Sequence, residues 1–413
     1  MDSISGKTVV LGVSGGIAAY KAAEIVRLLT KMGAGVRVVM TRNATQFVTP
    51  LTLQTLSGNP VSTSLFDLTQ ESEIGHIQLA DAADAIVVAP ATANIVAKLA
   101  TGMADDLLST VLLATRAPIV VAPAMNVHMY ENAAVQDNLD TLRRRGVRVI
   151  EPAVGALACG YEGPGRLPDP EIVVAEVARA LARDDLAGER VVVTAGPNRE
   201  ALDPVRFLSN RSSGRMGYAL AAAAWRRGAE VTLVTGPTAL PAPHGARTVP
   251  VCSAAEMHRA VRVEFKSATI LLMAAAVADY RPKSIAAEKL KKGEGGRVVE
   301  LIRTADILAD LPARRGAKLV VGFAAETERV LESATRKLAR KNLDLVVAND
   351  VSRSDAGFEV ETNAVTLIDA EGRRDLGLAT KDEIAERVLD RVVELRHERA
   401  AQPRRGRRKT SGR

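Results

Sequence analysis

The sequence predicts an α/β protein with two Rossmann-like, doubly wound domains, and three observations support this fold class. Short apolar runs rich in β-branched residues alternate with Ala- and Leu-rich stretches of helical length, as in parallel sheets that are buried on both faces. The alternation begins twice, near residues 7 and 190. Each time, a predicted strand is followed by a loop of small residues and then by a helix. The length of 413 residues also fits two or three domains.

The first half of the chain opens with a strand and a long helix. Helices are expected over Ile17–Met32 and, at the end of this half, over Ile172–Ala182. A short linker is expected at Asp184–Gly188, so the first domain is placed at residues 1–184. Buried strands are expected over Lys7–Val13, Gly35–Met40, Ala85–Ala89, Pro118–Ala122 and Val147–Ile150.

The second half repeats this pattern over residues 185–397. Helices are expected over Gly214–Arg227 and Lys381–Arg396. Residues 398–413 contain no apolar residue beyond Ala401, which predicts a disordered basic tail. Strands are expected over Arg190–Thr194, Glu230–Val234, Ala268–Leu272, Lys318–Gly322 and Leu343–Val347.

The net charge of +7 comes entirely from the C-terminal end. Residues 396–413 contain eight basic residues and one acid, and acidic and basic residues balance over the preceding part of the chain. A nucleic-acid-binding protein could use such a tail. The neutral body and the aromatic content of 3% argue against that alternative, because single-strand binders stack bases on aromatic side chains.

The cysteine content and the hydropathy pattern indicate a cytoplasmic protein. Two cysteines, Cys159 and Cys252, cannot build a disulfide framework. The first residues lack the positively charged start of a secretory signal. No apolar run approaches the roughly 18 residues that a membrane helix needs.

The loop Gly12–Ile17 joins the first strand to the first helix. It lacks the complete G-x-G-x-x-G fingerprint and the Lys-Ser/Thr pair of a P-loop. Glycines here serve either a tight turn with close helix packing or a phosphate site at a helix N-terminus. A mononucleotide fits the loop better than NAD or ATP, so a generic NAD oxidoreductase is the weakest alternative.

Three predicted loops in the first half carry side chains that suit catalysis. They are Gly75–Ile77 with His76, Pro123–Tyr130 with Asn126, and Gly155–Arg166 with Cys159. The second follows a strand at the carboxyl edge of the sheet, where open α/β sheets bind ligands. The third surrounds one cysteine with four glycines, which describes a flap that closes over a site. A solvent-exposed or core histidine and an inert cysteine are the alternatives.

These loops, together with Gly15–Lys21, Ala89–Asn94, Lys98 and Ala104–Leu108, resemble the homo-oligomeric flavin-containing cysteine decarboxylases. The resemblance implies a flavodoxin-like domain in which FMN supports oxidative decarboxylation of a C-terminal cysteine group. The family motif usually ends in Trp where this chain has Tyr130. A flavin-binding regulatory protein is the alternative, although it would not need the three candidate catalytic residues.

The same resemblance assigns roles to individual residues. His76 handles a proton as a base, Asn126 holds the substrate carboxylate, and Cys159 donates a proton to the reduced intermediate. The implied FMN contacts are Ser14, Gly15, Thr41, Arg42, Ala91, Thr92, Ala93 and Asn94.

The second half carries its own small-residue and lysine motifs. Asp203–Gly217 places Asn, Ser and Gly at a helix N-terminus beside arginines, which suits a phosphate. Met273–Tyr280 follows a strand, and the charge run Glu288–Lys292 is either a solvated face or a lysine cover for a triphosphate. These motifs resemble phosphopantothenate–cysteine ligases of the bacterial, CTP-using kind. Two departures are Gly196–Asn198 in place of Gly-Gly-Thr and Arg215 in place of Lys.

From about residue 7 to 396 the chain resembles the bifunctional decarboxylase/ligases of coenzyme A biosynthesis. This implies that CTP and Mg²⁺ activate 4′-phosphopantothenate as an acyl-cytidylate, and that cysteine then attacks it. Decarboxylation of the product gives 4′-phosphopantetheine. The resemblance also implies a homo-oligomer, a dodecamer built from decarboxylase trimers and ligase dimers.

The resemblance assigns ligase residues as well, but no Mg²⁺ ligands. Asn210 and Lys289 support formation and use of the acyl-cytidylate, and Arg206 and Asn210 bind substrate. The implied CTP contacts are Met273, Ala274, Ala275, Asp279, Lys289, Asp306, Ile307, Leu308, Ala309, Phe323, Lys337 and Lys341.

Overall fold

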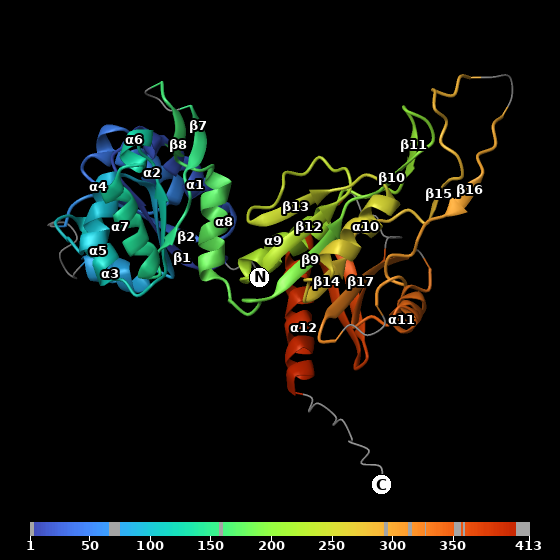
Figure 1. Ribbon diagram of the computed structural model, residues 1–413. Coiled ribbons are helices and arrows are strands. Elements are labelled where there is room, and N and C mark those ends of the chain that lie inside the picture. The colour runs from blue at the N-terminus through green and yellow to red at the C-terminus, as the bar shows by residue number, and fades with distance from the viewer. Residues whose placement is uncertain are drawn as a thin grey trace, which may run out of the picture. The chain divides into compact units, whose positions relative to one another are not determined.

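The chain forms two compact units, Met1–Arg183 and Asp184–Arg413, each built around one large sheet (Figure 1). The computed structural model describes residues 4–65, 75–156, 160–292, 296–312, 316–326, 328–350, 357 and 360–401.

The first unit has a parallel sheet of six strands. Its order is β3 (Val61–Ser62), β2 (Gly35–Met40), β1 (Thr8–Val13), β4 (Ala85–Ala91), β5 (Ile119–Pro123) and β6 (Arg148–Val149). Without the two-residue edge strand β3, the strands follow the flavodoxin-like order 2-1-3-4-5, and β3 extends it to 3-2-1-4-5-6. The order reverses between β1 and β4, which makes this the switch point where doubly wound sheets bind ligands.

Both faces of the first sheet are buried, as its continuous apolar strands predict. Val9, Leu11 and Val13 of β1 belong to one apolar cluster, and Val10 belongs to the cluster on the other face. The predicted helix 17–32 begins as a 3₁₀ turn, η1 (Ile17–Lys21), before α1 (Ala22–Lys31). The other elements are η2 (Ala44–Gln46), α2 (Pro50–Ser57), α3 (Gly75–Ala82), α4 (Ala93–Thr101), α5 (Leu107–Ala114), α6 (Val127–Tyr130), α7 (Ala133–Arg144), α8 (Pro170–Leu181) and the hairpin β7 (Ala153–Ala156)–β8 (Glu162–Arg166).

The motif around Lys98 and Asp106 links α4 to α5. The Asp106 side chain accepts a hydrogen bond from Ser109 N at 2.8 Å, and Ser109 Oγ accepts one from Asp106 N at 3.1 Å, which forms a capping box. Lys98 Nζ lies 2.6 Å from Asp105 Oδ1 and 2.7 Å from Asp106 Oδ2. These residues therefore fix the helix that follows the predicted FMN-binding segment.

The second unit has a mixed sheet of eight strands. Its order is β13 (Ala246–Pro250), β12 (Glu230–Thr235), β9 (Arg190–Ala195), β14 (Ile270–Met273), β17 (Leu319–Glu326), β18 (Leu345–Asp350), β19 (Thr362–Asp369) and β20 (Gly372–Thr380). The first six strands are parallel in the order 3-2-1-4-5-6, and the hairpin β19–β20 adds an antiparallel edge. The switch point again lies between two central strands, here β9 and β14.

Helices and two small hairpins complete the second unit. The helices are α9 (Arg215–Arg226), α10 (Ala254–Glu264), α11 (Val330–Arg340) and α12 (Lys381–Ala401). The strand pairs β10 (Arg199–Ala201)–β11 (Phe207–Ser209) and β15 (Tyr280–Pro282)–β16 (Leu301–Arg303) contact each other and project from one side of the unit (Figure 1). We call the projecting residues 199–209, 280–292 and 296–303 the arm.

The end of α12 corrects one prediction. The prediction that a disordered tail begins at residue 398 is wrong for residues 398–401, because α12 continues through Ala401. Arg396 pairs with Glu189 at 2.9 Å, Glu398 pairs with Arg391 at 2.8 Å, and Arg399 pairs with Asp344. These ion pairs hold the last helical turns on the unit. The rest of the predicted tail, residues 402–413, lies outside the described residues.

Candidate functional site

The loops that follow β1 and β4 are bonded to each other at the switch point of the first unit. Ser14, which is buried, donates from Oγ to Pro90 O at 2.8 Å and accepts from Thr92 N at 3.0 Å. Thr41 N donates to Val13 O at 3.0 Å, which brings in the loop after β2. Three of the predicted FMN-binding segments therefore meet at one edge of the sheet.

Two local features shape this edge of the sheet. A Cβ on Gly15 would lie 2.4 Å from Asn43 Cβ, so only glycine permits this approach of the two loops. In the described part of the chain, no side chain caps η1 at Gly16 or α4 at Thr92. The first N–H groups of α4, which starts with the predicted contacts Ala93 and Asn94, remain available to a ligand.

Of the predicted catalytic residues, two lie at the carboxyl edge of this sheet. His76 is half-buried in the first turn of α3, a helix that runs back along the sheet toward β4. Asn126 follows β5 and caps α6, with Oδ1 accepting from His128 N at 2.9 Å. Cys159 lies outside the described residues, between the strands of the β7–β8 hairpin.

The β7–β8 hairpin is fastened to the segment that carries Asn126. Met125 N donates to Gly165 O at 2.9 Å, and the rings of His128 and Tyr161 meet edge to face at 5.0 Å. A Cβ on Gly163, whose φ is +155°, would lie 2.8 Å from Val127 Cγ2. The hairpin that flanks Cys159 thus contacts the predicted carboxylate-binding segment directly.

Tyr130, which replaces the more usual Trp, has a polar partner. Its hydroxyl donates to Glu151 Oε2 at 2.8 Å, and Arg143 lies 2.6 Å from Glu151 Oε1. Burial, followed by the Glu151 hydrogen bond, raises the pKa of Tyr130, so the hydroxyl stays a neutral donor.

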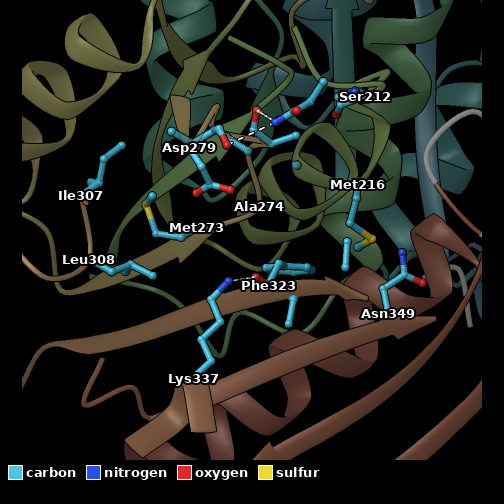
Figure 2. Close-up of a pocket in the computed structure, with 18 of the residues that line it drawn as sticks. Ser212, Met216, Met273, Ala274, Asp279, Ile307, Leu308, Phe323, Lys337 and Asn349 are labelled. Atoms are coloured by element: carbon cyan, nitrogen blue, oxygen red, sulfur yellow. Dashed lines mark hydrogen bonds between the residues drawn. The ribbon is translucent and has the colours of Figure 1, made fainter. Parts of the chain in front are cut away.

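A cavity of about 980 Å³ lies at the carboxyl edge of the second sheet (Figure 2). Its walls come from the start of α9, the segment after β14, the loop after β16, and β17 with α11. The sequence-predicted residues that line it are Asn210, Met273, Ala274, Ala275, Asp279, Asp306, Ile307, Leu308, Phe323, Lys337 and Lys341.

Three predicted ligase residues do not line this cavity in the part of the chain that the structure describes. Ala309 donates its backbone N–H to Asp306 Oδ1 at 3.1 Å, but it is not itself one of the residues that line the cavity. Arg206 pairs with Asp203, and Lys289 is exposed on the arm. The spacing of these residues along the sequence could not show that Arg206 and Lys289 lie outside the lining of the cavity.

Backbone hydrogen bonds shape the wall next to Asn210. Its Nδ2 donates to Ala276 O and Val277 O, both at 3.2 Å. Ala275 N donates to Thr194 Oγ1 at 3.1 Å, and Ala276 N donates to Gly196 O at 3.0 Å. The loops after β9 and β14 are therefore joined across the switch point of this unit.

Two lysines hold the opposite wall. Lys337 donates to the carbonyl oxygen of Phe323, and Lys341 pairs with Asp306. Burial raises the pKa of Asp306, but the Lys341 hydrogen bond and the Ala309 N–H together outweigh it and leave the pKa below its usual value. Asp306 is therefore an ionised acceptor.

The start of α9 faces the cavity and is closely packed. Gly214 has a φ of +80°, and a Cβ there would lie 2.8 Å from Thr238 Cγ2. One turn later, a Cβ on Gly217 would lie 2.5 Å from Ala195 Cβ. These glycines bring the helix N-terminus against the end of β9, where its N–H groups can meet an anion.

Several cavity residues were not predicted. Lys381 is buried beside Arg215, and its Nζ donates to Gly357 O at 3.0 Å. Burial, followed by the Arg215 charge, lowers the pKa of Lys381 to about 8. Asn349 could have been predicted from the sequence, because it is a polar residue that follows the predicted strand Leu343–Val347. The other unpredicted lining residues with polar side chains include Arg303, Arg340 and Asn363.

Comparisons with known proteins match both units. A flavoprotein family model matches residues 2–182, and the model for the DNA/pantothenate metabolism flavoprotein C-terminal domain matches residues 186–395. The coenzyme A biosynthesis bifunctional protein CoaBC of Vibrio cholerae is 50% identical over 397 residues, 95% of this chain and 100% of that protein. The chain belongs to this coenzyme A biosynthesis family. It is a bifunctional enzyme, and its first unit is a flavoprotein domain.

Other members of the family show similar likeness. The Bacillus subtilis CoaBC protein is 48% identical, covering 95% of this chain and 98% of its own. A crystal structure of the C-terminal domain of a CoaBC protein is 42% identical, with a TM-score of 0.45, and covers 52% of this chain and 99% of that one.

The described residues contain no helix with the length and apolar character to cross a membrane. Within the same ranges, no three or more His, Cys, Asp or Glu side chains group together as metal ligands.

Proposed function

We propose that the second unit ligates cysteine to 4′-phosphopantothenate with CTP, and that the first unit decarboxylates the product with FMN. The observation that carries the proposal is the cavity of about 980 Å³, whose lining includes most of the predicted nucleotide contacts. The family membership supports both activities, and we place the enzyme in the cytoplasm.

The cavity has two chemically different ends. Met273, Ile307 and Leu308 gather on one side, and Ser212 and Met216, at the start of α9, lie on the other (Figure 2). The apolar side suits a pyrimidine ring. The helix N-terminus, with Arg215 beside it, suits the phosphates. We therefore orient CTP with its base toward Leu308 and its triphosphate toward α9.

The proposed ligation proceeds through two displacements. A carboxylate oxygen of phosphopantothenate attacks the α-phosphorus of CTP and expels pyrophosphate, and the cysteine amine then attacks the acyl carbon and expels CMP. Asn210, fixed against Ala276 and Val277, would orient the acyl group. Lys289 would neutralise developing phosphate charge. Mg²⁺ would bind together with CTP, because it prefers hard oxygen ligands such as those of the triphosphate.

The first unit fits FMN at the edge formed by the loops after β1, β2 and β4. The uncapped start of α4 leaves N–H groups for the FMN phosphate, and glycine at position 15 lets the loops after β1 and β2 pack closely beside it. When bound, FMN supplies the thiol oxidation that stabilises the carbanion left by loss of CO₂. Asn126 would hold the substrate carboxylate, His76 would move a proton, and Cys159 would donate one.

We also propose that the chain assembles into a dodecamer. The arm exposes apolar side chains, among them Phe207, Ile285, Val298 and Leu301, and carries Lys289 away from its own cavity. Pairing of ligase units through the arm would cover this surface and bring Lys289 to the cavity of a second copy. The first unit exposes Ile17, Tyr20, Phe47 and Leu51 around the start of η1 and α2, and we assign this surface to trimer contacts.

One incubation tests the overall function. Phosphopantothenate, cysteine, CTP and Mg²⁺ should give masses of phosphopantothenoylcysteine and phosphopantetheine, together with pyrophosphate and CMP. The absence of both phosphopantothenoylcysteine and phosphopantetheine would contradict the proposed function.

Two variants test the division of labour. Lys289→Gln should lose CTP-dependent pyrophosphate release and keep decarboxylation of added phosphopantothenoylcysteine. Cys159→Ser should stay yellow and fail to release the thiol product. Equal loss of both activities in either variant would show that the residues are assigned to the wrong units.

A further inference from the structure

A buried carboxylate in the arm holds the segment that carries Lys289. Asp203 lies in the turn between β10 and β11, and its side chain is inaccessible to solvent. Its neighbour across the arm is the segment 286–290, which follows β15. We call Asp203 and Arg206, with their bonds to Leu290, the arm clamp.

The two oxygens of Asp203 have different partners. Oδ1 accepts from Val205 N and Arg206 N, both at 2.8 Å, which closes the local turn. Oδ2 accepts from Arg206 Nε at 2.9 Å and from Leu290 N at 3.1 Å. An aspartate that only shaped the turn would need Oδ1 alone, so the Oδ2 contacts require another explanation.

Leu290 is held at both of its backbone polar groups. Its N–H donates to Asp203, and its carbonyl accepts from Arg206 Nη2 at 2.7 Å. Four residues earlier, Ala286 N donates to Leu202 O at 3.1 Å. Lys289 lies between these two attachment points, so its backbone is fixed while its side chain is exposed.

The charge on Asp203 is stable over the working pH range. The Arg206 guanidinium, together with the N–H groups of Val205, Arg206 and Leu290, holds the pKa of this carboxyl well below its usual range despite burial. Asp203 therefore remains an ionised acceptor and does not exchange protons near neutral pH.

We propose that Asp203 is a positioning residue for ligation. It fixes the Lys289 segment on the arm, from which, in the proposed pair of ligase units, the amine can serve the nucleotide in the cavity of a second copy. This inference rests on the proposed role of Lys289. Lysine loses much side-chain freedom when it binds an anion, and a backbone already fixed at Leu290 removes the further cost of ordering the loop.

The substitution Asp203→Asn separates the clamp from the turn. Asparagine keeps an Oδ1 acceptor for Val205 and Arg206, but it places an NH₂ donor against the donors Arg206 and Leu290. In the full chain, trypsin should cut the Lys289–Leu290 bond at least about tenfold faster, with cuts in the first unit as internal reference. The kcat of ligation should fall at least about tenfold, and decarboxylation of added substrate should not change.

Asp369→Asn is the matched control. The Asp369 carboxylate is also shielded from solvent and pairs with Arg391 at 2.7 Å, between β19 and α12. Its loss should leave cleavage after Lys289 unchanged. If Asp203→Asn does not fold, Arg206→Lys supplies a second variant, because lysine keeps the charge but cannot reach Asp203 and Leu290 together. It should show a smaller increase in cleavage.

Three results would overturn the proposal: unchanged cleavage in Asp203→Asn, faster cleavage with unchanged ligation, or equal effects in Asp369→Asn. Failure of the underlying function looks different. In that case Lys289→Gln would keep full ligation, whatever the cleavage pattern of the Asp203 variant.

Discussion

The two units share one strand order around the switch point but build different sites there. In the first unit, Ser14 bonds the loop after β1 to Pro90 and Thr92, and the two described candidate catalytic residues stand on separate elements, His76 in α3 and Asn126 before α6. In the second unit, the equivalent loops are joined through Thr194 and Ala276 and open into a cavity lined by lysines and arginines.

This difference shows what topology does and does not determine. The order of parallel strands sets the edge at which a ligand binds, because loops after adjacent central strands diverge there. The chemistry comes from the side chains placed on those loops. The first unit provides a cradle for a cofactor that carries the reaction, and the second provides charge for a reaction between substrates.

The largest expected effect comes from adding one methyl group to a closely packed glycine beside each site. Gly15→Ala should bring Cβ to 2.4 Å from Asn43 Cβ, and Gly217→Ala should bring it to 2.5 Å from Ala195 Cβ. Because backbone must move in each case, the first variant should lose flavin and at least about 100-fold of decarboxylation. The second should lose a similar factor in ligation. Absorbance at flavin wavelengths and the two assays report the results.

The two glycine variants control each other. Gly15→Ala should keep CTP-dependent ligation, and Gly217→Ala should stay yellow. A variant that impaired both activities equally would mean that the sites are not independent.

A smaller effect is expected from the buried cation of the second cavity. The pKa of Lys381 falls from 10.5 to about 8, so between these pH values the unfolded chain binds a proton that the native protein does not. Stability should therefore rise with pH across this window, by up to about 3 kcal/mol at 1.36 kcal/mol per unit. Below pH 8 the penalty is complete and constant.

Unfolding of the wild type and Lys381→Met at pH 7.5 and pH 10 measures this gain. At pH 10, any excess in the free energy of unfolding of Lys381→Met over the wild type should shrink, or the wild type should become the more stable of the two. An identical pH dependence in both would contradict the depressed pKa. Release of flavin from the first unit should show no such difference.

The sequence could predict the elements whose signal is local. Gly35–Met40 was predicted at its observed bounds, because three valines and a methionine give it the apolar, β-branched character of a buried parallel strand. The alignment of carboxyl edges followed from parallel pairing. Asn210 and Phe323, more than one hundred residues apart, were assigned to the ligase site through the family resemblance, and both line the cavity.

Other features depend on contacts that no local pattern records. The hairpin β19–β20 was missed because its second strand is mostly exposed and rich in charge. Lys381 was predicted only as the start of a helix, and nothing near it in sequence indicated burial in the cavity. The distance between Lys289 and its own cavity results from the projection of the arm.

The smallest expected effect concerns the end of the second unit, where the charge pattern misled the prediction. Ending the chain after residue 401 removes six of the basic residues and should change the free energy of unfolding by less than about 0.5 kcal/mol. Ending it after residue 395 also removes the bonds of Arg396 to Glu189 and of Arg399 to Asp344. That loss should cost about 1–3 kcal/mol, because these partly buried pairs include a bidentate arginine.

Thermal unfolding of both truncated chains separates the two kinds of basic residue. Flavin release from the first unit should be unchanged in each, because within the described residues Arg396, Glu398 and Arg399 form their ion pairs with side chains of the second unit. Equal stability of the two truncated chains would mean that the last turns of α12 contribute nothing. A loss on removing only residues 402–413 would mean that charge beyond the helix, and not the ion pairs of Arg396 and Arg399, stabilises the second unit.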